Sequence, residues 1–219
     1  MKIGSIGEDK NFEKRIAITP DIAKKYISLG FEVYLSKNYG AHLGITDNEY
    51  SSLGVKFSND EREILNSVNI VVQLALLTEE KSSFLKQDQI FIGVLNPYRN
   101  KDRLDKLLKK KINSFSLELL PRITRAQSMD ILSSQANLAG YKAVVEAFQV
   151  YEKAIPMMMT AAGTIPAAKV LVVGAGVAGL QAIATAKRMG AVVLHFRNNH
   201  QAESLYYIIF FLQLFYQIY

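Results

Sequence analysis

The stretch KVLVVGAGVAGLQAIATAKRMGAVV, residues 169–193, decides the fold of the C-terminal part of this chain. The apolar run KVLVV leads directly into three glycines with the spacing G-x-G-x-x-G, and helix-forming residues follow. In this spacing the first glycine allows a tight turn, the second lets a pyrophosphate approach the backbone, and the third lets the helix pack closely on the strand. The helix start also directs free N–H groups toward the phosphates. The stretch therefore predicts a dinucleotide site, and its position between strand and helix favours binding over a merely structural turn. The predicted pyrophosphate contacts are Gly174, Gly176, Val177, Ala178 and Gly179.

One feature of such a site is missing. An Asp or Glu about 20 residues further on normally accepts hydrogen bonds from the ribose hydroxyls. No acidic residue occurs between Gly174 and Glu203, and the second strand ends in Arg197. Two interpretations follow: Arg197 neutralises a 2′-phosphate and shifts the preference to NADP, or the sequence after about residue 194 is foreign to the fold. A sharp change of composition at the same place favours the second.

The segment after residue 194 is an atypical apolar tail. Its last sixteen residues are almost all Tyr, Ile, Phe and Leu, interrupted by two glutamines toward the end. A membrane-spanning helix needs about 18–20 apolar residues, so a membrane span is not favoured. We expect a truncated or frame-shifted product.

Composition limits the remaining possibilities. The chain has 219 residues, of which 49% are hydrophobic and 21% charged, and it has room for one or two globular domains. Its net charge is +6, but the densest basic run, residues 99–111, also contains acids and leucines at helical spacing. That pattern indicates a solvated helix rather than a nucleic-acid surface. The absence of cysteine and the three scattered histidines predict no metal site, and no signal peptide is expected.

Strands and helices alternate along the chain, as is typical of βαβ units around a parallel sheet. Strands are expected at 1–7, 31–38, 68–76, 89–95 and 112–120, and helices at 19–30, 46–54, 101–111 and 133–153. Residues 154–169 are expected to form a loop whose methionines pack in a core or between domains. The predicted class is α/β, with two Rossmann-like parallel-sheet domains, the second incomplete. The expected division is an N-terminal domain 1–135, a linking helix and loop 136–165, and a partial nucleotide-binding domain 166–219.

Three segments carry a resemblance to a known family: EKRIAITP (13–20), PRITRAQSMDILSSQANLAGYKAVVEA (121–147) and residues 157–193. They resemble the NAD(H)-binding part of the alpha subunit of proton-translocating NAD(P) transhydrogenase, in the alanine dehydrogenase/transhydrogenase family. The resemblance implies a peripheral, homodimeric component on the cytoplasmic face of the inner or plasma membrane. It implies hydride transfer from NADH to NADP(H) bound on a partner subunit, coupled to proton movement through membrane-embedded subunits.

The resemblance also implies a loop beside the nicotinamide. Its orienting residues correspond to Arg122, Gln127, Asp130 and Ser133, and Ile123 and Thr124 join them as cofactor contacts. Hydride transfer moves no proton, so catalysis depends on positioning, and carboxylate, hydroxyl and guanidinium groups are suited to orienting the ring. Gln127 suits a contact with the second nucleotide. The alternative is an ordinary helix cap, because SMDILSS can start the long helix unaided.

Two further functions stay open. An alanine dehydrogenase-like oxidoreductase needs a proton donor and cationic groups for pyruvate; its pattern has a lysine near position 73 and a histidine near 96, where this chain has Gln73 and Asn96. Gln73 also departs from the lysine often found there in transhydrogenases, and Arg15 occurs in both. The other alternative is a truncated non-catalytic fragment or tethered NAD-binding module, because about half of the second domain is expected to be missing. Such a domain leaves one sheet edge unpaired and one apolar face uncovered.

Overall fold

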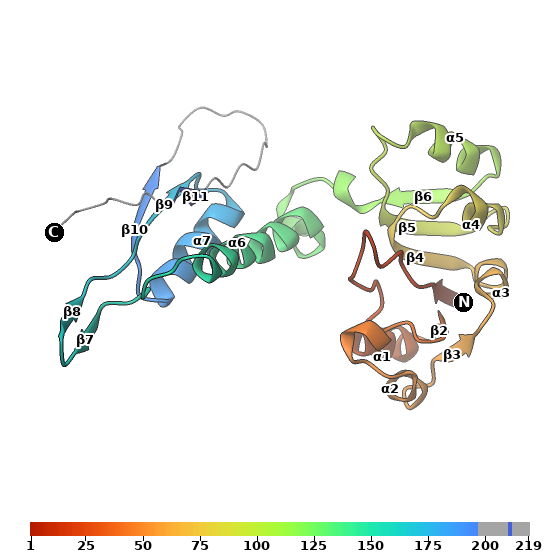
Figure 1. The fold of residues 1–219 in the computed structure, drawn as a ribbon. Helices are drawn as coiled ribbons and strands as arrows, with labels where there is room; N and C mark the ends of the chain where they lie inside the picture. Colours follow the sequence, from red (N-terminus) through yellow and green to blue (C-terminus); the bar gives the residue numbers. More distant parts are fainter. Residues whose placement is uncertain (197–209, 212–219) are drawn as a thin grey trace. The chain divides into compact units, whose positions relative to one another are not determined.

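A computed structural model of the chain describes residues 1–196 and 210–211 (Figure 1). The chain divides into two compact units, Met1–Met129 and Asp130–Tyr219. The three-part division predicted from the sequence stays a prediction.

The first unit is built on a sheet of six parallel strands. The strands are β1 (Lys2–Ser5), β2 (Glu32–Ser36), β3 (Lys56–Ser58), β4 (Ile70–Ala75), β5 (Ile90–Val94) and β6 (Asn113–Ser116). Their order is β3-β2-β1-β4-β5-β6, which is the doubly wound order of Rossmann-like folds. The direction of winding reverses between β1 and β4, and ligands of such sheets bind at the carboxyl ends of the strands beside this point.

Short helices connect these strands. They are α1 (Pro20–Ser28), the 3₁₀ turn η1 (Ala41–Leu43), α2 (Asp47–Ser51), α3 (Glu61–Ser67), α4 (Glu79–Ser83) and α5 (Lys101–Lys109). Thr19 caps α1 as predicted, because its side chain accepts a hydrogen bond from the Ile22 N–H. The elements β3, α3 and α4 were not expected from the sequence. Each has only three to seven residues, too few to show a hydrophobic period.

Two hydrophobic clusters cover the two faces of this sheet. Val71 belongs to a cluster that includes residues of α3 and α5, whereas the neighbouring Val72 packs against a cluster that includes residues of α1 and α2. Consecutive residues of a strand point to opposite faces. The first unit is therefore a three-layer α/β domain, as the sequence predicted.

Gln73 is a buried link between the two central strands. Its side chain is 2% exposed, and its Oε1 accepts hydrogen bonds from the Ser5 Oγ (2.7 Å) and the Ile6 N–H (2.9 Å). Ser5 Oγ also hydrogen-bonds Tyr39 OH at 2.8 Å. The glutamine that departs from the family pattern therefore has a structural role at the centre of the sheet.

Replacing Gln73 with leucine is expected to lower the free energy of unfolding by about 1–3 kcal/mol. Leucine has a similar size but offers no acceptor to the buried Ile6 N–H. Urea unfolding measures the change, with Gln87→Leu as the matched control at an exposed position. Equal unfolding midpoints for Gln73→Leu and the wild type would contradict this role.

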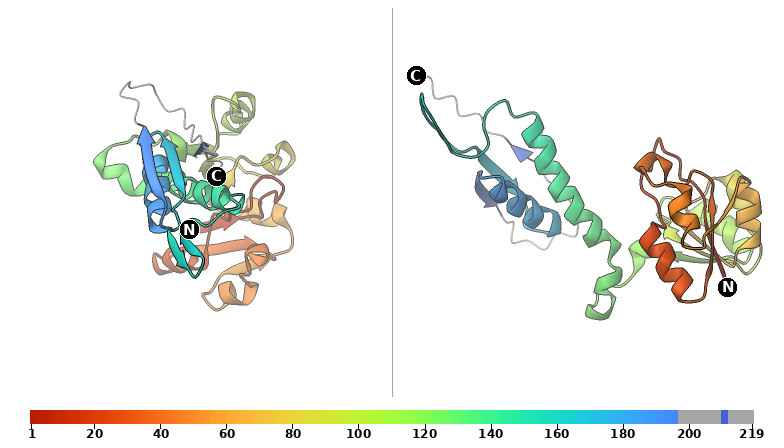
Figure 2. Two further views of the ribbon diagram at one scale, coloured as in Figure 1. Left: turned by 60° about the vertical axis from the view of Figure 1, so that its left-hand side comes forward. Right: turned by 90° about the horizontal axis from the view of Figure 1, so that it is seen from below.

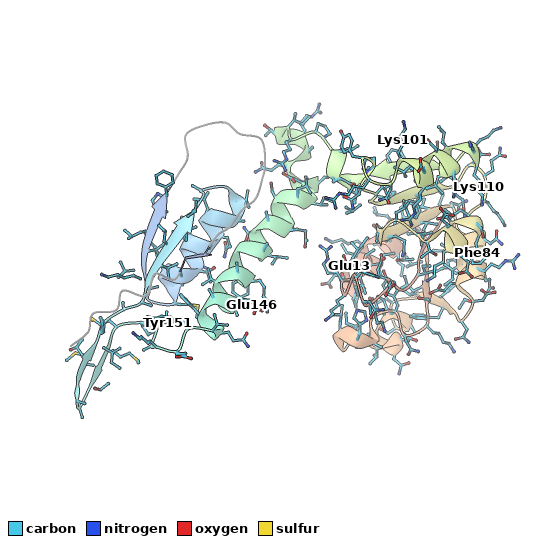
Figure 3. The ribbon with its side chains drawn as sticks, turned by 45° about the horizontal axis from the view of Figure 1, so that its top comes forward. Glu13, Phe84, Lys101, Lys110, Glu146 and Tyr151 are labelled. Atoms are coloured by element: carbon cyan, nitrogen blue, oxygen red, sulfur yellow. The ribbon has the colours of Figure 1, made fainter. Side chains whose placement is uncertain are left out.

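The second unit is smaller. Its elements are α6 (Ile131–Gln149), β7 (Met158–Thr160), β8 (Gly163–Ile165), β9 (Lys169–Val173), α7 (Val177–Arg188), β10 (Val192–Phe196) and β11 (Phe210–Phe211). The helices α6 and α7 lie side by side and pack on the sheet β10-β9-β11 (Figure 2). Their shared core contains Val144, Phe148, Val170, Val172 and Ala182. On the exposed side of α6, Lys142 and Glu146 form an ion pair at 2.5 Å, with Glu146 labelled in Figure 3.

Within the described residues, one face of β10 is exposed. Val193 packs against the core, while Val192, Leu194 and Phe196 alternate with it and are 51%, 61% and 62% exposed. An apolar face of this kind was predicted. On the other side of β9, β11 pairs with it in antiparallel orientation over two residues.

Residues 154–169 were predicted to be an irregular loop, and that prediction was wrong for part of the segment. β7 and β8 form an antiparallel hairpin, whose turn is closed by Thr160 Oγ1 donating to the Gly163 carbonyl and accepting from the Ala162 N–H. Met157 and Met159 are 64% and 84% exposed, so they do not pack in the core of this unit. The hairpin shows no alternating pattern because both of its faces are largely exposed.

Among the helices in the described part of the chain, none combines the length and apolar composition needed to cross a bilayer. Arg197 and most of the apolar tail lie outside the described residues. The expectations about the ribose anchor and the tail therefore stay predictions.

Candidate functional site

The glycine turn has the geometry that its spacing predicts. Gly174 follows β9 with φ +106°, in the left-handed region that favours glycine. A Cβ on Gly179 would lie 2.2 Å from the Gly174 carbonyl oxygen, so only glycine lets α7 pack this closely on the turn. A Cβ on Gly176 would meet no atom of the described residues within 4 Å. The backbone at Gly176 is thus open to a close approach by a ligand.

The N-terminus of α7 is suited to an anion. The first N–H groups of a helix have no intrahelical acceptor, and they carry the positive end of the helix dipole. Gly176 is the N-cap residue and provides no side-chain cap, and the first turn of α7 contains no acidic residue. Val177 and Ala178, the first residues of α7, therefore present N–H groups with no competing carboxylate in that turn.

The loop before α6 is divided between the two units. Arg122, Ile123, Thr124 and Gln127 lie in the first unit, and Thr124–Met129 form the 3₁₀ helix η3. Asp130 and Ser133 lie in the second unit at the start of α6. The structure therefore brings Asp130 and Ser133 together at the start of α6. The five residues of the glycine turn form a separate group at the start of α7.

Asp130 and Ser133 form a helix cap. Asp130 Oδ1 accepts the Ser133 N–H at 2.9 Å, and Asp130 Oδ2 accepts the Ser133 hydroxyl at 2.7 Å. This is the geometry of the capping alternative. Since a carboxylate has about four lone-pair sites, capping does not by itself exhaust the capacity of Asp130 as an acceptor.

Glu8 is a polar residue of the first unit that the sequence did not single out. Glu8 lies three residues after the end of β1, and its Oε1 accepts hydrogen bonds from the Leu74 N–H (2.6 Å) and the Ala75 N–H (3.4 Å). Burial raises the pKa of the Glu8 carboxyl above its usual range; the charge of Glu13 adds to this, while the two backbone N–H groups and Lys81 oppose it. Glu8 lines a cleft of about 610 Å³ at the carboxyl ends of the central strands. Its place at the reversal of strand order is the signal that could have identified it.

The raised pKa of Glu8 predicts a pH dependence of stability. The folded state holds this proton more tightly than the unfolded state, so the free energy of unfolding falls as pH rises from the ordinary carboxyl range through the raised pKa. Glu8→Gln keeps the acceptor and removes the titration. We expect this variant to exceed the wild type in stability at about pH 7 and to lose that advantage near pH 4. Urea unfolding at both pH values checks this, with the exposed Glu80→Gln as control; a difference independent of pH would contradict it.

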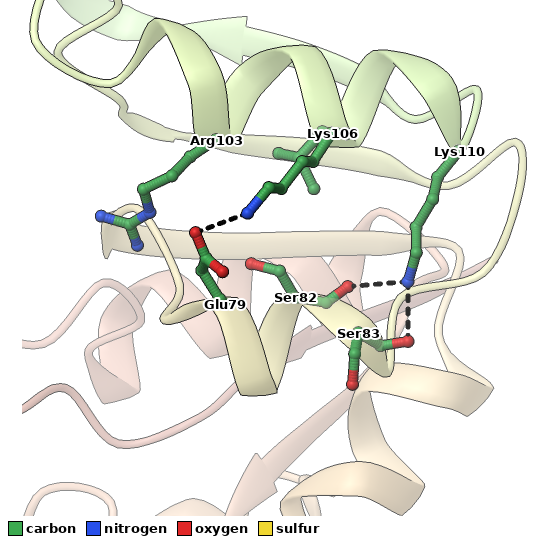
Figure 4. A pocket seen from close by; sticks show the side chains of 7 residues that line it. Glu79, Ser82, Ser83, Arg103, Lys106 and Lys110 are labelled. Atoms are coloured by element: carbon green, nitrogen blue, oxygen red, sulfur yellow. Dashed lines mark hydrogen bonds and ion pairs between the residues drawn. The ribbon is translucent and has the colours of Figure 1, made fainter.

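A second pocket of about 260 Å³ lies between α4 and α5 (Figure 4). Its cations already have partners: Lys106 pairs with Glu79 at 2.7 Å, Lys110 donates to the Ser82 and Ser83 carbonyls, and Arg103 donates to the Leu76 and Leu77 carbonyls. These contacts hold the basic helix against its neighbour. Within the described residues, no three His, Cys, Asp or Glu side chains gather as metal ligands.

Two models of known protein families match this chain. Residues 4–139 match the model of the alanine dehydrogenase/PNT N-terminal domain, and residues 143–210 match that of the C-terminal domain. The first match alone covers more than half of the chain.

Several similar relatives are named as the first part of NAD(P) transhydrogenase subunit alpha. The protein from Rickettsia prowazekii is 46% identical over 94% of this chain and 56% of its own length, and that from Rhodospirillum rubrum is 45% identical over 89% and 52%. The crystal structure of transhydrogenase from Sinorhizobium meliloti is 42% identical with a TM-score of 0.85, covering 89% of this chain and 58% of that one. The chain therefore spans about half the length of the curated relatives it matches.

Alanine dehydrogenases are more distant. The enzyme from Methanococcus maripaludis is 29% identical over 88% of this chain and 52% of its own length. A solved L-alanine dehydrogenase is 21% identical, with a TM-score of 0.73 over 87% of this chain and 53% of that one, which shows the shared fold. The chain belongs to the alanine dehydrogenase/PNT family, and the transhydrogenase alpha subunits are the nearer of the two groups compared.

Proposed function

We propose that this chain is the NAD(H)-binding component of a proton-translocating transhydrogenase. The observation that carries the proposal is the open backbone at Gly176, in front of an α7 N-terminus without a side-chain cap. The similarity to proteins named as a part of NAD(P) transhydrogenase subunit alpha supports the same function.

Two groups of residues bind different parts of the cofactor. The backbone of Gly174, Gly176, Val177, Ala178 and Gly179 binds the pyrophosphate, with the N–H groups of α7 as donors. Asp130 and Ser133 orient the nicotinamide, with the carboxylate of Asp130 as an acceptor for its carboxamide. Arg122 and Gln127, with Ile123 and Thr124, complete the nicotinamide side. Bound NADH supplies the hydride, and the protein contributes positioning rather than proton transfer.

The remaining parts of the proposal concern partners. NADP(H) binds on a partner subunit, membrane-embedded subunits couple the exchange to proton movement, and the component is a homodimer on the cytoplasmic face. The names of the relatives, which describe one portion of a subunit, support a multi-subunit assembly.

Binding and transfer assays test the function. The chain is expected to bind NADH, followed by the fluorescence of the reduced nicotinamide. It is expected to transfer hydride to an NADP analogue only after the NADP-binding subunit of a relative is added. Oxidation of NADH with pyruvate and ammonium in the absence of any partner would instead identify an alanine dehydrogenase.

A non-catalytic NAD-binding module is the second candidate. The uncovered apolar face of Val192, Leu194 and Phe196 favours it, because this face is available for tethering. Binding of NADH without transfer after partner addition would select this candidate.

A further inference from the structure

The helices α6 and α7 touch through their backbones at one place. A Cβ on Gly140 of α6 would lie 2.1 Å from the carbonyl oxygen of Ala178 and 2.9 Å from its carbonyl carbon. Both atoms belong to the main chain, so they cannot move aside as a flexible side chain does. Glycine is the residue that permits this approach, and the two helices run side by side here (Figure 2).

The contact falls on the predicted phosphate turn. Ala178 is the second residue of α7 and one of the predicted pyrophosphate contacts. Its neighbour Gly179 packs in turn against the Gly174 carbonyl. Backbone contacts therefore run without a break from α6 to the start of the turn.

The other end of α6 carries the predicted nicotinamide contacts. Gly140, Val144 and Phe148 form the buried stripe of the helix, and the residues before Gly140 are exposed or half-buried. The Asp130–Ser133 cap lies at the start of this segment. Ser133 precedes Gly140 by seven residues, which is about 10 Å along the helix axis. In NADH a single ribose separates the pyrophosphate from the nicotinamide ring.

We propose that Gly140 is a positioning residue that sets the distance between the pyrophosphate turn and the Asp130–Ser133 cap. This inference rests on the proposed function. A Cβ at position 140 lies 2.1 Å from the Ala178 carbonyl oxygen, so the two backbones must separate by more than about 1 Å before ordinary contact distances return. The turn keeps its own geometry, whereas the cap moves away from the nicotinamide ring.

The Gly140→Ala variant tests the proposal against two ligands. NADH carries the nicotinamide, and ADP-ribose lacks it but retains the pyrophosphate. Gly140→Ala is expected to reduce the affinity for NADH at least about tenfold and that for ADP-ribose less than about threefold. Adding Ser133→Ala to Gly140→Ala is expected to cause no further loss of NADH affinity, because the cap is already displaced.

Ala139→Gly is the matched control. Ala139 is exposed next to Gly140, and its replacement exchanges the same two residue types in the opposite direction. Alanine is the better helix former, so helix propensity alone would make Gly140→Ala the stabilising change and Ala139→Gly the destabilising one. We expect Ala139→Gly to keep the wild-type preference for NADH over ADP-ribose.

The outcomes separate the inference from the function on which it rests. Failure of the wild type to bind NADH overturns the proposed function and the inference with it. If the wild type binds NADH, an unchanged affinity for NADH in Gly140→Ala overturns the inference alone. An equal loss of affinity for NADH and for ADP-ribose, with the effect of Ser133→Ala adding to that of Gly140→Ala, overturns it as well.

A second variant decides the question if Gly140→Ala does not fold. One alanine inserted after Ala136 leaves the Gly140–Ala178 contact in place and shifts the cap by about 1.5 Å and 100° around the helix. The affinity of this variant for NADH is expected to fall toward its affinity for ADP-ribose. Its affinity for ADP-ribose is expected to equal that of the wild type. Wild-type affinity for NADH in this insertion variant would overturn the proposal.

Discussion

Gly176→Ala is expected to lower the affinity for NADH at least about 100-fold while changing the free energy of unfolding by less than about 1 kcal/mol. The backbone of Gly176 has φ −76°, which alanine adopts freely, and its Cβ would meet no atom within 4 Å in the part of the chain that the structure describes. The added methyl group instead occupies the space through which a pyrophosphate approaches the turn. Binding and stability are therefore expected to respond very differently.

Fluorescence titration with NADH and thermal unfolding measure the two effects of Gly176→Ala. Gly7→Ala in the first unit is the matched control, since its Cβ would lie at an ordinary 3.8 Å from Ser36 Oγ. The control is expected to bind NADH as the wild type does. Wild-type affinity in Gly176→Ala would mean that no phosphate approaches the chain at this turn.

Gly179→Ala is expected to destabilise the second unit by about 3 kcal/mol, the upper part of the range for overpacked sites. Its Cβ would lie 2.2 Å from the Gly174 carbonyl oxygen and 2.9 Å from the carbonyl carbon, so either the turn or α7 must shift. NADH binding is expected to be lost together with stability, unlike in Gly176→Ala. The comparison separates a glycine needed for the fold from a glycine needed for the ligand.

Hydrogen exchange of the α7 amides is the suitable measurement for Gly179→Ala, because two units need not unfold in one step. Protection is expected to fall in α7 and to stay unchanged in the first unit. Leu180→Ala, at a side chain 58% exposed, is the control and is expected to change stability by about 0.5 kcal/mol or less. Unchanged protection of α7 in Gly179→Ala would contradict the close packing of the turn.

The sequence predicts the parts of the molecule that depend on local rules. Thr19 caps α1 because a hydroxyl accepts the free N–H groups of a helix start, whatever surrounds it. Gly174 adopts positive φ, and Gly179 packs on it, because glycine has no Cβ to strain the left-handed backbone or to collide with the turn. The doubly wound class follows in the same way from alternating strands and helices.

Features that depend on distant residues are not visible in the sequence. Nothing near Gly140 indicates that it faces the backbone of Ala178, thirty-eight positions later. Glu8 becomes a half-buried carboxyl bonded to the Leu74 N–H only because the strand order places β4 beside β1. The β7–β8 hairpin was missed because its strands have three residues each and no buried face.

Two positions in the sequence disfavour the alanine dehydrogenase alternative, and the structure shows how each is used. Gln73 is used to link the central strands. Asn96 has φ +47°, a left-handed conformation that asparagine tolerates, and its N–H donates to Glu118. The Gln73 side chain and the Asn96 backbone thus have structural roles.

Amide chemical shifts recorded during addition of NADH test most directly whether the glycine turn and the Asp130–Ser133 cap contact one cofactor. NADH is expected to shift the amides of Gly176, Ala178 and Ser133, together with that of Gln127, whereas ADP-ribose is expected to shift only those of the turn. If NADH shifts the amides of the turn and leaves Ser133 and Gln127 unchanged, the loop does not contact the nicotinamide and the proposed site is wrong.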